Sequence, residues 1–216
     1  MLFRSRELRK SLPHYDKLDE AVRSALRAAE TPFLHPEMFD ENVDKSSSVL
    51  GYCKAIDLLL ERELGRRHLF PKLENSLVEF QNVLHSVSLN ESYPDLALVM
   101  RALKVEGQFS AQSFPLHKMA MVAQSILSGK ILHDRMKTID GLRAWAIVLL
   151  LFARKNLVGL RPLIPVRGAG DDEVVKIARR LIQLQEVRNP AAHRETYPKF
   201  PTIQDVRRDA LETLNQ

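Results

Sequence analysis

A short segment near the C-terminal end of the sequence places an arginine, an asparagine and a histidine close together. Its residues are Arg188-Asn189-Pro190-Ala191-Ala192-His193. A guanidinium holds a phosphate through a planar fork of donors, and an imidazole moves protons near neutral pH. These side chains together could therefore bind a phosphate and transfer a proton beside it, which is the chemistry needed to cleave RNA without a metal.

A structural interpretation of the same residues stays open. Cations near a helix C-terminus interact favourably with the helix dipole and bond the last carbonyls. Arg188 would then be a helix cap, and His193 would be an ordinary histidine beside a proline turn.

The pattern Arg-Asn-x-x-x-His resembles the motif of the HEPN superfamily (higher eukaryotes and prokaryotes nucleotide-binding), in the form common among its ribonucleases. The resemblance is densest over residues 184–193. A second segment, Gly51-Tyr52-Cys53-Lys54-Ala55-Ile56-Asp57, is similar to the upstream helix of the family, which carries a lysine and an acid. The resemblance implies an all-α, HEPN-like helical bundle with the motif near its C-terminal end.

For this chain, the resemblance implies a metal-independent endoribonuclease that needs no cofactor. The 2′-hydroxyl of RNA would attack the adjacent phosphorus and leave a 2′,3′-cyclic phosphate and a 5′-hydroxyl. His193 would act as general base or acid, Arg188 would bind the phosphate and stabilise transition-state charge, and Asn189 would orient one of them. Arg194 and Lys199 are candidates for further phosphate contacts or are solvated surface cations.

Two motifs usually meet across a dimer interface in this family, and the chain has one, so we expect a homodimer or a partner that supplies the second copy. The implied role is an RNA-targeting toxin or phage-defence effector, restrained by an antitoxin or another regulatory partner. Many of the family's toxins carry a tyrosine two residues after the histidine, where this chain has Glu195. The alternatives are a non-catalytic HEPN-like module that binds a nucleotide or mediates dimerisation, and an unrelated helical adaptor.

The composition is that of a globular protein whose positive net charge suits an anionic partner. The 216 residues carry a net charge of +5, with 45% hydrophobic and 27% charged residues, which excludes disordered and fibrous classes. Aromatic residues make up only 6%, so RNA contacts would rely on Arg and Lys rather than on base stacking.

The single cysteine, Cys53, excludes an intramolecular disulfide and a cysteine-based metal cluster. No secretory signal is recognised at the N-terminus, and a reducing cytoplasm is the expected location. The apolar run at residues 144–153 is shorter than the roughly 20 residues needed to cross a bilayer, so it predicts a buried helix and no membrane partner.

Pro and Gly divide the sequence into segments with helical periodicity, and no segment alternates as a strand would. The sequence predicts residues 1–40 to be an N-terminal helical extension and residues 41–216 to be the HEPN-like bundle domain. Helices are expected at about 14–30, 41–63 with a stop at Gly65, 71–85, 94–104 with Pro94 in its first turn, 115–127 with its exit at Ser128-Gly129, and 139–156.

A long loop is predicted at residues 159–170, followed by a helix that begins with Asp171, Asp172 and Glu173 and leads to the motif. The apolar stripe of this helix places Arg188 close to buried positions. Asn189-Pro190 is expected to interrupt the helix, with His193 on a new turn that starts at Pro190. A last helix is expected from Thr202, as N-cap, to about Leu214.

Overall fold

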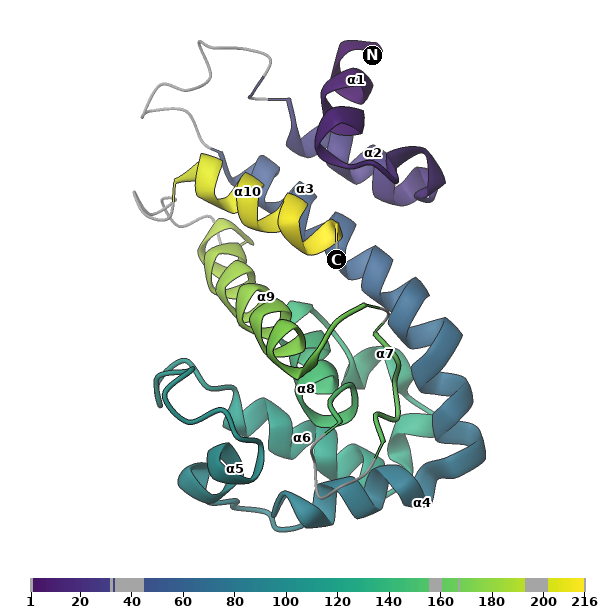
Figure 1. The fold of residues 1–216 in the computed structure, drawn as a ribbon, viewed down its shortest axis with the longest axis vertical. Helices are drawn as coiled ribbons and strands as arrows, with labels where there is room; N and C mark the ends of the chain where they lie inside the picture. The colour runs from purple at the N-terminus through teal and green to yellow at the C-terminus, as the bar shows by residue number, and fades with distance from the viewer. Residues whose placement is uncertain are drawn as a thin grey trace. The chain divides into compact units, whose positions relative to one another are not determined.

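The computed structural model describes residues 2–31, 33, 45–155, 161–166, 168–192 and 202–215. Every regular element in these ranges is a helix, in the order that Figure 1 traces along the chain. The predicted all-α class is therefore confirmed.

The chain forms two compact units. Unit 1 consists of Met1–Glu61 and Gln183–Gln216, and unit 2 is Arg62–Ile182. The expected division into an extension of residues 1–40 and a domain of residues 41–216 stays a prediction. In the observed grouping, the described part of residues 1–40 belongs to unit 1, which also holds Arg188 and Asn189.

Unit 1 contains α1 (Leu2–Ser11), the short 3-10 helix η1 (Tyr15–Lys17), α2 (Glu20–Ala29), α3 (Ser46–Leu60), the last part of α9 (Asp171–Ala192) and α10 (Ile203–Leu214). Both α2 and α10 pack against α3, and Figure 1 shows α10 alongside it. Gly51 allows α2 and α3 to approach closely, because a Cβ there would lie 3.0 Å from Ala29 Cβ and 3.1 Å from the Ala25 carbonyl oxygen.

The first elements of unit 1 differ from the sequence prediction. The helix expected from about residue 14 begins at Glu20, because Asp19 is extended (ψ 154°) and forms the N-cap of α2. Before it, α1 and η1 were not predicted. Leu8, Leu12 and Tyr15 from this region are buried, so the segment contributes to the core of unit 1.

Unit 2 contains most of the π-helical segment η4 (Glu61–Leu69), α4 (Phe70–Ser86), α5 (Leu96–Ala102), α6 (Leu116–Leu127), the 3-10 helix η5 (Lys130–Leu132), α7 (Arg135–Thr138), α8 (Leu142–Phe152) and the first part of α9. Its core surrounds α8, in which every side chain from Ala144 to Phe152 is buried. The Phe80 and Phe152 rings meet edge to face, with 4.7 Å between centroids.

The predicted buried helix is thus confirmed as α8, although it is shorter than the expected 139–156. Among the described helices, none has both the length and the apolar character that a membrane crossing requires.

Gly65 does not stop a helix, contrary to the prediction. Helical conformation continues from α3 through η4 into α4. A Cβ at Gly65 would lie 2.8 Å from Trp145 Cη2 and 3.1 Å from Phe70 Cε2. The glycine is therefore explained by the close approach of Trp145 rather than by a helix end.

Two helix ends show how local signals succeed and fail. Gly129 follows α6 with φ +70°, which confirms the predicted exit. At α5 the N-cap is Asp95, whose carboxylate accepts from the amides of Ala97 (2.7 Å) and Leu98 (3.2 Å). Pro94 therefore precedes the cap rather than occupying the first turn, because an aspartate supplies the acceptor that the first amides need.

Candidate functional site

The helix that carries the motif is α9, and its first turn holds Asp171, Asp172 and Glu173 as predicted. Negative charge at this end favours the positive end of the helix dipole. The predicted apolar stripe is buried, and it consists of Val174, Ile177, Ala178, Leu181, Ile182 and Leu184, with Val175, Val187 and Ala191 also buried.

Proline 190 does not interrupt α9, which is a correction to the sequence prediction. The helix continues through Asn189 and Pro190 to Ala192. A proline removes one amide donor, to the carbonyl four residues earlier. Only two helical residues follow Pro190, and that carbonyl belongs to Glu186, whose side chain is exposed. The last turn therefore tolerates the proline, and Arg188 and Asn189 lie on the same helix as the apolar stripe.

Arg188 is half-buried and lies near Cys53 of α3. Burial raises the pKa of the Cys53 thiol to about 12; the positive charge of Arg188 opposes this shift, and the carboxylate of Asp57 adds to it. The thiol of Cys53 also contacts the Leu184 carbonyl oxygen at 3.7 Å. The guanidinium thus lies where α9 packs against α3, with a carboxylate on the same side of α3.

Asn189 is exposed, and its amide oxygen accepts a hydrogen bond of 2.7 Å from Nε2 of Gln185, one turn earlier. Gln185 is itself buried, with 8% of its surface exposed. The contact sets the orientation of the Asn189 amide and leaves its NH₂ group on the exposed side. An amide held in this way can donate a hydrogen bond to a ligand without reorganising.

His193, Arg194 and Lys199 lie outside the described residues. The structure therefore brings together Arg188 and Asn189 and does not test the predicted positions of the other three. The described chain resumes at Thr202, the N-cap of α10.

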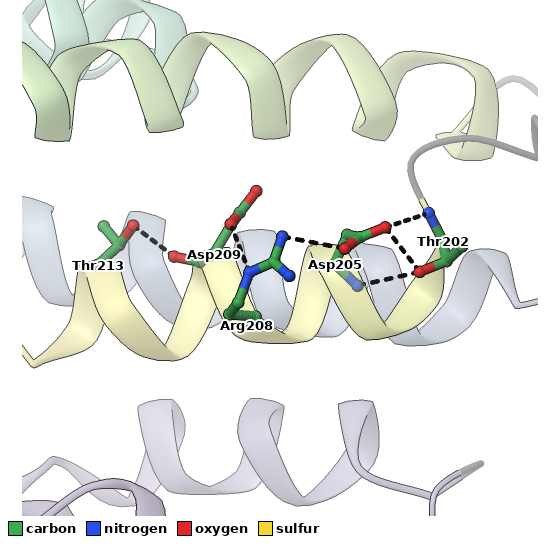
Figure 2. Close-up of polar contacts among 5 residues, drawn as sticks. All are labelled: Thr202, Asp205, Arg208, Asp209 and Thr213. Carbon is green, nitrogen blue, oxygen red and sulfur yellow. Dashed lines mark hydrogen bonds and ion pairs between the residues drawn. The ribbon is translucent and has the colours of Figure 1, made fainter.

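The start of α10 is held by a capping box, as Figure 2 shows. The hydroxyl of Thr202 accepts from the Asp205 amide at 3.2 Å, and the Asp205 carboxylate accepts from the Thr202 amide at 3.0 Å. The Thr202 hydroxyl and amide lower the pKa of Asp205. The predicted N-cap and the end at Leu214 are both confirmed.

The segment similar to the upstream HEPN helix forms the middle of α3. Tyr52 is fully buried, and its hydroxyl donates a 2.6 Å hydrogen bond to the Glu30 carboxylate. Lys54 is exposed and Asp57 is half-buried. Asp57 follows Cys53 by four residues and therefore shares its side of α3, where the Cys53 thiol contacts Leu184 of the motif helix.

The Arg135 cluster, which the described residues form in unit 2, has a structural role. Arg135 pairs with Glu74 and lies over the Phe70 ring, with its Cζ 5.2 Å from the centroid. Within the same residues, no group of three or more His, Cys, Asp or Glu side chains is arranged to hold a metal ion.

Sequence reasoning missed two neighbours of the motif. Gln185 precedes Asn189 by four positions, a spacing at which helical side chains touch, so this contact could have been found. The contact of Cys53 with α9 depends on tertiary packing and has no local signal.

Comparisons with known proteins give no assignment, because no protein-family model, no curated protein and no solved structure matches the chain.

Proposed function

We propose that this protein is a metal-independent endoribonuclease of the HEPN type, with Arg188, Asn189 and His193 as its catalytic residues. The observation that carries the proposal is the Arg-Asn-x-x-x-His spacing, with its first two residues on the last turn of α9. Arg188 is half-buried there, while Asn189 is exposed and held by Gln185.

In the proposed mechanism, His193 takes the proton from the 2′-hydroxyl of RNA or donates one to the leaving 5′-oxygen. The 2′-oxygen forms a bond to phosphorus as the bond to the 5′-oxygen breaks, which leaves a cyclic phosphate and a 5′-hydroxyl. Arg188 neutralises the negative charge that develops on the phosphoryl oxygens. Asn189 orients Arg188 or His193 by a hydrogen bond. DNA lacks the attacking hydroxyl and is not cleaved.

The partial burial of Arg188 supports this role. A guanidinium beside the buried Cys53 is less hydrated than one in open solvent, so its attraction to a phosphate is less screened. Asp57, on the neighbouring helix α3, is half-buried and acts on the same Cys53 thiol as Arg188. Arg194 and Lys199 would add phosphate contacts along the segment that follows.

A homodimer that joins two motifs, or a partner that supplies the second, is part of the proposal, as is the restraint of the enzyme by an antitoxin or another regulatory protein. Light scattering of the purified chain tests the dimer. A monomer that cleaves RNA would remove the composite site from the proposal.

The ribonuclease itself is tested by incubating total RNA with the wild type, Arg188→Ala or His193→Ala in the presence of a chelator. We expect cleavage by the wild type with 2′,3′-cyclic phosphate ends, and a loss of about 10³-fold or more in each variant. His14→Ala and Arg208→Ala are matched controls, because both residues are exposed in unit 1, and both should cleave normally. Unchanged cleavage by His193→Ala would overturn the assignment, and intact binding without cleavage would favour the non-catalytic module.

A further inference from the structure

The net positive charge of the chain lies in one of its two units. Unit 2 has 18 Lys and Arg against 11 Asp and Glu, a net charge of +7, whereas unit 1 has 14 against 16, a net charge of −2. Unit 1 carries the proposed cleavage motif. A long polyanion such as RNA gains electrostatic attraction from unit 2 rather than from the unit that would cut it.

Within unit 2, Arg101 and Lys104 lie at the end of α5, and Arg179 contacts the turn 103–109 that follows. We name these three cations and the turn the α5–α9 corner. Arg179, on α9, donates to Oε1 of Gln108 at 3.3 Å, and its Cζ lies 5.6 Å from the centroid of the Phe109 ring. These contacts hold the guanidinium against the turn that follows α5.

A second arginine fixes the other side of the turn. Arg154, which follows α8, is 7% exposed and donates through Nη1 to the Leu103 carbonyl oxygen. Burial lowers the pKa of Arg154, and Asp171 and Asp172 oppose that effect. The charges of these two acids are therefore offset by a buried guanidinium.

Lys104 is exposed and adopts a left-handed conformation, with φ +53°. The Val105 amide bonds the Met100 carbonyl at 3.0 Å and the Lys104 amide bonds that of Arg101 at 2.9 Å, which is the helix end where glycine is usual. In the part of the chain that the structure describes, the Lys104 ammonium makes no ion pair. Its charge is therefore directed to solvent from a fixed backbone.

The corner carries three cations against one acid, Glu106. Arg101 is 72% exposed, and its ion pair with Glu106, which is itself 59% exposed, is long, at 3.5 Å. A contact of this kind contributes little and is exchanged easily for a phosphate. Gly107, on the same turn, has nothing within 4 Å of the place where a Cβ would be, so a ligand can approach its backbone.

We propose that the α5–α9 corner holds phosphates of an RNA strand through Arg101, Lys104 and Arg179. RNA as the ligand rests on the proposed function. The corner reads phosphates and not bases, since its groups are cations with no exposed aromatic ring among them. It would position the strand on unit 2 while cleavage depends on Arg188 and His193.

The test measures binding separately from cleavage, in full-length protein that carries His193→Ala. A fluorescein-labelled single-stranded RNA is titrated in chelator at several salt concentrations, and its anisotropy is recorded. Against this background, Arg101→Gln with Lys104→Gly should weaken binding about tenfold. The negative slope of log K against log salt should become less steep by about 1.4, since each lost single-strand phosphate contact removes about 0.7. Lys104→Gly suits the left-handed backbone, so the Tm should not fall.

The matched control is Arg66→Gln with Arg67→Gln, which also removes two positive charges, from exposed positions of η4 in unit 2. If both double variants lose RNA affinity equally, RNA is attracted by net charge alone, and the proposed phosphate site at the α5–α9 corner is wrong. Unchanged affinity and salt slope in the Arg101/Lys104 variant would overturn it as well. If the wild type does not cleave RNA but the corner variant loses binding, the ribonuclease fails and the corner stands.

Discussion

Arg207 donates two hydrogen bonds to the carboxylate of Glu30, of 2.8 Å from Nε and 3.1 Å from Nη2, across 177 positions of the sequence. Glu30 is 4% exposed and follows the last residue of α2, whereas Arg207 belongs to α10. The Tyr52 hydroxyl of α3 donates to the same carboxylate. One buried acid thereby links three helices of unit 1.

Replacing this acid should destabilise the protein measurably. Glu30→Gln leaves the Arg207 guanidinium without its charged partner, and we expect a loss of about 2 kcal/mol in the free energy of unfolding, below the full cost of a buried pair because Arg207 is 28% exposed. Urea unfolding measures the change. Glu20→Gln is the control, since this acid of α2 is 65% exposed and its ion pairs should contribute less than about 1 kcal/mol.

Gly65→Ala should cost more than the same change at an open position. Its new Cβ would meet Trp145 Cη2 at 2.8 Å inside the core of unit 2, so we expect about 1–3 kcal/mol of destabilisation. Gly170→Ala is matched to it, because nothing lies within 4 Å of that position, and should change stability by under about 1 kcal/mol. Equal Tm values for the two variants would contradict the packing of Trp145 on Gly65.

Stability should fall as the solution becomes alkaline, in part because of Cys53. Its folded pKa of about 12 lies above the ordinary thiol value of 9.0, so above pH 9 the unfolded state loses the proton first. The free energy of unfolding then decreases with rising pH, by at most about 1.4 kcal/mol per pH unit from this group, until the folded pKa is reached. Chemical unfolding of the wild type and Cys53→Ala at a series of pH values measures this.

Cys53→Ala removes the titrating thiol and should show a shallower decline above pH 9. Parallel curves for the two proteins would mean that the thiol ionises equally in both states. Tyr52, whose pKa is also raised chiefly by burial, contributes a decline of the same sign to both proteins and does not affect their difference.

The capping box of α10 gives a local test. Thr202→Ala removes the acceptor for the Asp205 amide and should cost about 1 kcal/mol, whereas Thr202→Ser keeps the hydroxyl and should cost less than half of that. Thermal unfolding of the two variants separates loss of the cap from loss of the methyl group, and equal losses would show that the hydroxyl contributes nothing.

The elements that sequence predicted well are those whose ends are set by their own residues. Thr202 and Asp205 stand at the spacing of a capping box, and Gly129 adopts a left-handed turn at the end of α6. Such signals need only a few neighbouring residues. The buried character of α8 was equally clear, because its apolar run leaves no polar face.

The errors come from positions where packing decides. Gly65 has the local signature of a helix end, but Trp145, distant in sequence, is what requires the glycine. Pro190 has the signature of a break, but it lies so near the end of α9 that the lost bond does not disrupt the helix. For the candidate site, spacing found Arg188 and Asn189, while the contact between Cys53 and Leu184 required the packing of α3 on α9.

The division of unit 1 between the two ends of the sequence has a consequence for biosynthesis. Unit 2 is a continuous stretch of the chain and can assemble once Ile182 has left the ribosome. In unit 1, α3 can pack against α10, and Glu30 can bind Arg207, only after the C-terminal residues have been synthesised. Contacts of such long separation close slowly, because the loop entropy is lost before any contact compensates for it. The half of the molecule that carries Arg188 therefore matures last, after unit 2 has been synthesised in full.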